Sequence, residues 1–193
     1  MRRRTVSALQ KASIALCVLY GGIAFADTVP VPASVQANLT AKLLAYDRGL
    51  PSRVSGVVKI LVLIDPSEGQ SQKIANEFAA AMKGRGTISN LPIEVVTANF
   101  DNATSVAARI KRERTAAVYL SSGLARSAEA IAIALKGIDV MTVAAEPSAV
   151  IRGIAVGFDL LSGQPKILVN LGQAKTQNVQ LPASVLSLAL IQG

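Results

Sequence analysis

Residues 153–193 read GIAVGFDLLSGQPKILVNLGQAKTQNVQLPASVLSLALIQG, and this stretch decides how the sheet of the protein ends. Apolar residues at every second position of 154–160 predict a β-strand with unequal faces. Ser162-Gly163-Gln164-Pro165 then breaks the pattern with turn residues, and a second apolar strand follows at 166–171. Two strands separated by so short a break predict an antiparallel hairpin.

Two further features of this stretch carry expectations. Asn170 is an amide inside an otherwise apolar strand, and we expect it to be structural, satisfying backbone groups at the hairpin, because a buried amide must find partners. Leu181-Pro182 predicts the start of a helix, since proline is favoured at the first helical position. The face of this helix is expected to carry Val185, Leu188 and Ala189.

Upstream of the hairpin, apolar strands alternate with amphipathic helices. Strands are expected at 57–64, 92–97, 116–120 and 138–144, and helices at 33–47, 70–83, 102–114 and 124–136, with a helical turn at 146–152. The first helix is expected to pack through Val35, Leu39, Leu43 and Tyr46. This alternation predicts an α/β fold, a Rossmann-like three-layer sandwich with a mostly parallel sheet that ends in the antiparallel hairpin.

The first 26 residues have the pattern of a cleaved export signal. Their positively charged start consists of Arg2, Arg3, Arg4 and Lys11. A short apolar run follows and ends in Ala24-Phe25-Ala26, the small-x-small pattern that signal peptidases accept. A retained N-terminal anchor is the alternative. We therefore expect residues 1–26 to be removed and 27–193 to form a single exported domain without a membrane span.

The composition excludes much chemistry. The chain has no histidine, and its one cysteine, Cys17, lies inside the expected signal. Serine–histidine and cysteine–histidine catalysis and zinc sites built on those residues are therefore excluded. Four of the 20 basic residues also lie in the signal, which leaves a surplus of only four over the 12 acidic residues. Since no aromatic residues interleave with the basic ones, we expect no nucleic-acid partner. We also expect no catalytic residue, metal or cofactor.

Two loops after predicted strands offer candidate sites, since ligands of open α/β sheets bind at strand carboxyl ends. Ser121-Ser122-Gly123 combines small residues with a following helix, which is typical of an anion cradle and equally of a capped strand-to-helix turn. Asp65 and Glu68 follow the first buried strand. Two carboxylates without further oxygen ligands make a weak metal site, and a turn is the simpler reading.

Two charged clusters complete the candidates. Arg109, Lys111, Arg112 and Arg114 gather at the end of one helix. They complement the helix dipole as a solvated face, or they form a docking patch for an acidic partner. Tyr46-Asp47-Arg48 ends the first helix and either faces a partner or fixes the exit of that helix through an ion pair.

Parts of the chain resemble the YfiR-like (DUF4154) family. The resemblance is carried by VMTV at 140–143, by residues 149–153, and by GIAVGFDLLSGQPKILVNL and LPASVLSLALI in the final stretch. Within these, the matching features are Thr142-Val143, Gly153, Ile167 to Asn170, Ala174 and Ser184 to Ala189. AKLLAYDR at 41–48 resembles the first helix of the family. The similarity extends over about residues 33–191.

The resemblance implies a periplasmic signal-transduction regulator that is not an enzyme. Members of the family bind the periplasmic sensor domain of an inner-membrane diguanylate cyclase and hold it inactive, which lowers cyclic-di-GMP and biofilm formation, and they can form homodimers. This sequence lacks the family's cysteines, and Tyr-Asp-Arg at 46–48 replaces its F-x-x-W-P helix ending. The alternative from another class is a small-molecule binding module related to one lobe of a periplasmic solute-binding protein.

Overall fold

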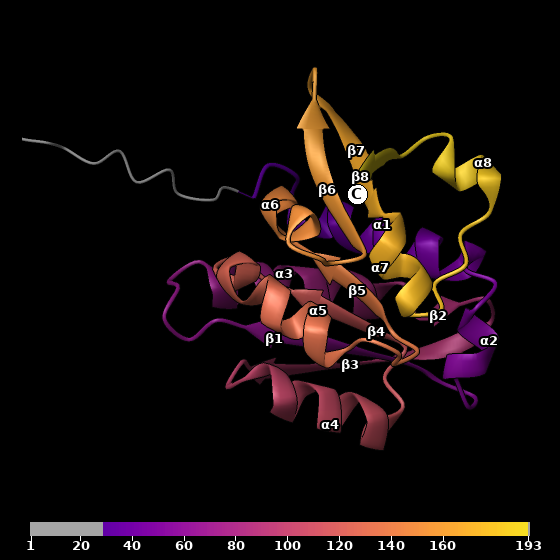
Figure 1. Cartoon of the computed structure of the whole chain (residues 1–193), viewed down its shortest axis with the longest axis horizontal. Helices are drawn as coiled ribbons and strands as arrows, with labels where there is room; N and C mark the ends of the chain where they lie inside the picture. Colours follow the sequence, from indigo (N-terminus) through magenta and orange to yellow (C-terminus); the bar gives the residue numbers. More distant parts are fainter. Residues whose placement is uncertain (1–28, 193) are drawn as a thin grey trace, which may run out of the picture.

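An eight-stranded sheet forms the centre of the fold (Figure 1). The computed structural model describes residues 29–192, so the expected export signal at 1–26 lies outside the described residues. The strands are β1 (Val58–Ile64), β2 (Thr87–Ile88), β3 (Leu91–Asn99), β4 (Ala117–Leu120), β5 (Met141–Ala144), β6 (Val156–Leu161), β7 (Gln164–Asn170) and β8 (Leu190–Gln192). Their spatial order is β2-β3-β1-β4-β5-β6-β7-β8.

The strand directions match the predicted mixed sheet. β3, β1, β4, β5 and β6 run parallel to one another, and β6 pairs antiparallel with β7. Short antiparallel β2 covers one edge, and β8 returns parallel to β7 at the other. The predicted α/β class with a C-terminal antiparallel hairpin is therefore confirmed.

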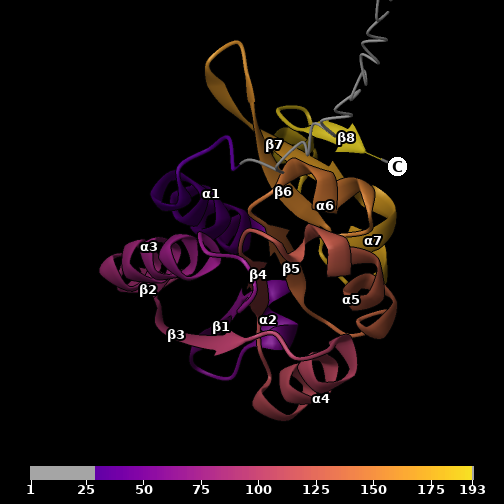
Figure 2. The same ribbon diagram turned by 90° about the vertical axis from the view of Figure 1, so that its left-hand side faces the viewer.

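Helices cover both faces of this sheet (Figure 2). They are α1 (Ala33–Tyr46), α2 (Leu50–Arg53), α3 (Ser71–Gly84), α4 (Ala103–Glu113), the 3-10 turn η1 (Leu124–Ser127), α5 (Ala128–Ala134), α6 (Pro147–Ile151), α7 (Leu171–Thr176) and α8 (Ala183–Leu186). One apolar core lies between the sheet and the pair α1 and α3, and a second lies between the sheet and α4, η1 and α5. None of the helices within 29–192 is long and apolar enough to cross a membrane.

The hairpin turns through Ser162 and Gly163, whose φ angles of 52° and 76° are both positive. Two central residues with positive φ match the twist of the flanking strands, which explains the two-residue connection between Leu161 and Gln164. The outer half of the hairpin is exposed and projects beyond the rest of the domain in both views (Figures 1 and 2).

The prediction of which face of α1 is buried is wrong by part of a helical turn. Leu43 is buried, but Val35 and Leu39 are only half-buried and Tyr46 is 60% exposed. The buried residues of α1 are Ala33, Gln36, Ala37, Thr40, Ala41, Leu43 and Leu44. Small residues dominate this set because α1 packs closely against α3 and the sheet, where large side chains would hold the helices apart.

The predicted C-terminal helix is also largely wrong. Only one turn forms, α8, and the chain then extends into β8. Val185 is buried as expected, whereas Leu188 is 73% exposed. The strand forms where its backbone can pair with the otherwise open edge of β7, so that both chains find partners for their backbone groups.

Candidate functional site

The loops after β1 and β4 meet where the chain changes face of the sheet. β1 leads into α3 on one face, and β4 leads into η1 and α5 on the other. This is the switch point at which open α/β sheets bind their ligands. The structure brings both predicted loops together there, namely Asp65 to Glu68 and Ser121 to Gly123.

Ser121 and Ser122 are buried in this loop region. The hydroxyl of Ser121 donates to the carbonyl of Leu63 at 2.7 Å and lies 2.5 Å from Ser71 Oγ. Ser71 Oγ in turn accepts the N–H of Asp65 at 2.7 Å. Ser122 Oγ has no hydrogen-bond partner among the described residues. Ser121 and Ser71 therefore connect the two loops inside the fold, and Ser122 is buried beside them rather than open to solvent.

The backbone of Gly123, which an anion cradle would need, is already engaged. Its N–H donates to Glu146 Oε1 at 2.8 Å. Asp65 is also close, since a Cβ at position 123 would stand 2.7 Å from Asp65 Oδ2. Two carboxylates therefore lie near Gly123, and their charge disfavours a bound anion at the predicted cradle.

Asp65 is held as a carboxylate by its neighbours. Burial alone would raise the pKa of Asp65, but hydrogen bonds from Ser67 and the charge of Arg126 outweigh it and place the pKa below its ordinary value of 3.8. Oδ1 accepts from the backbone and hydroxyl of Ser67 at 2.9 and 2.7 Å, and Oδ2 pairs with Arg126. Within residues 29–192, no three His, Cys, Asp or Glu side chains group to hold a metal ion.

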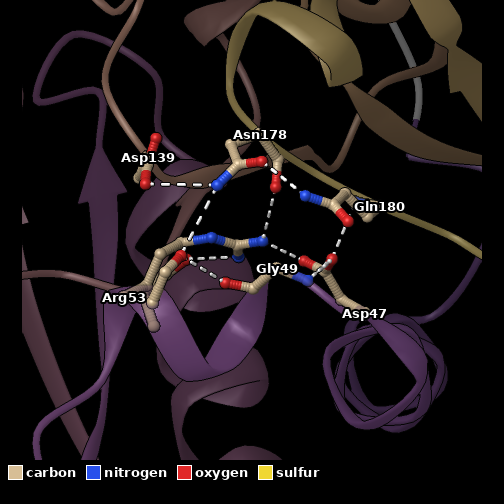
Figure 3. A network of polar contacts seen from close by, with 8 residues as sticks. Asp47, Gly49, Arg53, Asp139, Asn178 and Gln180 are labelled. Carbon is tan, nitrogen blue, oxygen red and sulfur yellow. Dashed lines mark hydrogen bonds and ion pairs between the residues drawn. The ribbon is translucent and has the colours of Figure 1, made fainter.

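The three residues of the cluster Tyr46-Asp47-Arg48 lie in different environments, and Figure 3 shows the contacts of Asp47. Asp47 turns inward, where its carboxylate pairs with Arg53 and accepts the N–H groups of Gly49 at 2.9 Å and Gln180 at 2.7 Å. Tyr46 and Arg48 remain exposed. An ion pair therefore fixes the end of α1, and its cation is Arg53 and not the neighbouring Arg48.

Arg53 extends this network to distant segments. Its guanidinium also donates to the carbonyls of Asn178 at 3.3 Å and Ala116 at 3.4 Å. Arg53, Asn178 and Gln180 were not expected from the sequence, since no local pattern links residues 125 positions apart. The network fixes the end of α1 to the segment that leads into α8.

Tyr46 lines an apolar pocket of about 200 Å³ between α1, β7 and α8. Its wall consists of Leu39, Leu43, Tyr46, Ile167, Val185 and Leu188. Lys42 is the one charged residue that lines it. The sequence does not reveal this pocket, because only the tertiary fold brings its lining residues from α1, β7 and the α8 region together.

A second apolar pocket of about 240 Å³ lies on the other side of α8. Its lining includes Val169, Ala174, Val179, Leu181 and Leu186, with Lys175 as the one charged residue. We call these two pockets together the α8 surface. The pairing register places Ile191 of β8 on the same face of the sheet as Val169, and it is also exposed, which extends the apolar area.

The basic end of α4 is partly neutralised. Arg109 and Arg112 both pair with Glu113, and these contacts offset the effect of burial and lower the pKa of Glu113. Lys111 and Arg114 instead line a shallow pocket of about 200 Å³ that also contains Asp139.

Asn170 caps α7: its Oδ1 accepts the N–H of Gln173 at 2.9 Å, and its Nδ2 donates to the carbonyl of Val150 at 3.2 Å.

Solved structures with a similar fold include domains of binding proteins. A conserved domain protein from Vibrio cholerae O1 biovar El Tor str. N16961 superposes with a TM-score of 0.63 at 16% identity, over 84% of this chain and 60% of that one. The ABC domain in complex with L-Trp from Streptococcus pneumonia gives 0.58 at 15% identity, over 84% and 62%. A ligand-free, open substrate-binding protein with adhesive properties from Clostridium difficile gives 0.51 at 16% identity, over 69% and 54%.

At these identities the likeness shows the fold alone, and the chain spans less than two thirds of each of these structures. No curated protein matches the sequence. The family model of the YfiR/HmsC-like proteins, DUF4154, matches residues 33–190, which include both α1 and the α8 surface. The chain therefore belongs to the YfiR/HmsC-like family.

Proposed function

We propose that this protein is a non-enzymatic periplasmic regulator that binds the periplasmic sensor domain of an inner-membrane diguanylate cyclase and represses it. Repression would lower cyclic-di-GMP and with it biofilm formation. The regulatory class and the location are supported by the family.

The observation that carries the proposal is the α8 surface. Leu188 and Tyr46 are 73% and 60% exposed beside a pocket that is itself lined by aliphatic side chains. Clusters of exposed large apolar side chains around a concavity are typical of protein-binding surfaces, because their burial in a complex supplies the main driving force. The switch point contrasts with this, since its hydroxyl and amide groups are largely engaged with one another.

Repression needs a surface and no catalytic group. A regulator shifts its partner towards the inactive state when it binds that state more tightly than the active one. A fixed surface serves this purpose, and the Asp47–Arg53 network fixes the two sides of the α8 surface relative to each other.

A gene deletion and a capture experiment test the proposal. Deletion in the strain that carries the gene is expected to raise cyclic-di-GMP, and the exported protein, tagged at its C-terminus, is expected to capture a membrane protein with a cyclase domain. Unchanged cyclic-di-GMP together with no cyclase among the captured proteins would contradict the proposal.

The second candidate is a small-molecule binding module, which the fold of the solute-binding structures favours. Its site would lie at the switch point. A ligand that binds only the folded state at 100 times its Kd would stabilise the protein by about 2.7 kcal/mol. A thermal-shift screen of amino acids and sugars therefore separates the two functions: a regulator of this kind gives no large rise in Tm.

A further inference from the structure

The charges of the α8 surface all have one sign. Each of its two pockets is lined by a single charged residue, Lys42 in one and Lys175 in the other. Neither α1 nor the whole stretch 160–192 contains an aspartate or a glutamate. The nearest carboxylate at the end of α1, Asp47, is buried against Arg53. The surface itself therefore offers no acidic side chain to either lysine.

The shape of the surface restricts what can cover it. Val185 lines one pocket and Leu186 lines the other, so the single turn of α8 forms a ridge between them. Their volumes of about 200 and 240 Å³ suit individual large apolar side chains, which bind best in enclosed pockets that exclude water. An occupant with two apolar anchors would place one on each side of α8.

We infer that the α8 surface binds an acidic amphipathic segment of a protein partner, with two apolar anchors in the two pockets and carboxylates beside Lys42 and Lys175. This inference rests on the proposed function in one respect, that the partner is a protein. Complementary charge steers such a segment to the surface and fixes its register, while the anchors supply most of the affinity.

Two other occupants fit less well. A second copy of this chain meeting the surface about a two-fold axis would present the same acid-free patch, so neither lysine would gain a carboxylate. An anionic lipid surface would satisfy the lysines, but membranes are entered by protruding apolar side chains on a convex face, whereas this surface is hollowed into two pockets.

Peptide selection tests the inference without any cyclase. A displayed library of random peptides, each about 16 residues or roughly four helical turns long, is selected on the immobilised protein. Enriched peptides are expected to combine two apolar anchors with flanking Asp or Glu. Their affinity is expected to fall about tenfold or more for the double variant Lys42→Glu and Lys175→Glu. The matched control, Lys73→Glu with Lys136→Glu, changes the net charge equally at exposed positions outside the α8 surface and is expected to bind as wild type.

Results of three kinds would overturn the inference. The first kind comes from the peptide selection itself, namely enrichment of neutral or basic peptides or equal binding by both double variants. The second is co-flotation with phosphatidylglycerol vesicles that the Lys42/Lys175 variant alone loses, which would assign the surface to a membrane. The third is a dimer, seen by sedimentation, that competes with the peptides and is dissociated by Leu188→Glu. Since the selection uses only this protein, acidic peptides combined with unchanged cyclic-di-GMP would reject the cyclase and leave the surface assignment standing.

Discussion

Asp47 and Arg53 form an ion pair whose two side chains are completely shielded from solvent. Asp47 follows the last residue of α1, and the same carboxylate accepts the N–H of Gln180 on the approach to α8 (Figure 3). The two walls of the first pocket, which come from α1 and α8, are thus connected through one buried pair. The stability of the domain and the shape of its candidate binding surface depend on the same contacts.

Removal of one member of this pair is expected to be costly. Asp47→Asn keeps the size of the side chain but leaves the buried guanidinium of Arg53 without its counter-charge, and such changes cost about 3–5 kcal/mol. The free energy of unfolding, measured by urea denaturation, reports the loss. Arg48→Met is the control, since Arg48 is exposed and its loss is expected to stay within about 0.5 kcal/mol. Equal stability of Asp47→Asn and wild type would refute this role.

A methyl group at Gly123 is expected to disturb the switch point. The φ angle of Gly123 is 85°, and an added Cβ would stand 2.7 Å from both Asp65 Oδ2 and Glu68 Cβ. Gly137→Ala has a similar φ of 75° with no atom within 4 Å, so it measures the backbone strain alone, about 1 kcal/mol. Gly123→Ala should lose clearly more unfolding free energy than Gly137→Ala, because the clash adds to the strain. Equal losses of unfolding free energy in the two variants would contradict this prediction, because they would mean that the loops at the switch point move apart without cost.

The buried hydroxyl of Tyr119 is expected to stabilise the apolar core between the sheet and the helices α1 and α3. It donates to Gln36 Oε1 at 3.0 Å, and Gln36 Nε2 donates to the carbonyls of Val31 and Ala145. Burial and the charges of Glu146 and Glu77 raise the pKa of Tyr119, so the hydroxyl stays protonated. Tyr119→Phe leaves Oε1 of Gln36 buried and unpaired, which costs about 1–3 kcal/mol. Thermal unfolding of Tyr119→Phe beside wild type measures this cost, and an unchanged Tm would contradict it.

Acid is expected to weaken the contribution of Asp65. The pKa of Asp65 in the folded protein lies below its ordinary value of 3.8, so the folded state favours the carboxylate. The resulting stabilisation is therefore present above pH 3.8 and is lost as the pH falls through the lower, folded pKa. The difference in unfolding free energy between wild type and Asp65→Asn should be constant near neutral pH and shrink below that value. A difference that persists unchanged to about pH 2 would contradict the lowered pKa.

The order of the longer strands and helices up to β7 could be predicted because it depends on local periodicity and turn residues, whereas the short elements α2, β2 and α7 were not predicted. The hairpin at Ser162-Gly163 is the clearest case, since two residues with positive φ determine the connection. The buried face of α1 could be predicted only in part: Leu43 is buried as expected, but close packing against α3 places Ala37, Thr40 and Ala41 inside instead of Val35, Leu39 and Tyr46. Strand β8 was missed because an open sheet edge, which no local pattern reveals, decides its conformation.

The candidate sites likewise depend on tertiary contacts that no local sequence pattern reveals. Ser121 to Gly123 lie in the loop that the sequence indicates, but Glu146, which binds the N–H of Gly123, comes from the loop after another strand. Arg53 and Gln180 likewise reach Asp47 only through the tertiary fold. The α8 surface combines the second half of α1 with residues from 167–188, more than 100 positions later, and of its lining residues only Tyr46 was a surface candidate in the sequence.

Binding through the α8 surface is tested most directly by cyclic-di-GMP levels in a deletion strain that expresses one of two matched variants. Leu188→Glu places a charge on the α8 surface, where Leu188 is 73% exposed, and Ile133→Glu places one on α5, where Ile133 is 70% exposed. We expect Ile133→Glu to restore the low wild-type level and Leu188→Glu to leave it as high as in the deletion strain, with both proteins folded and equally abundant. Restoration of the low level by Leu188→Glu would contradict the claim that this surface binds and represses the cyclase.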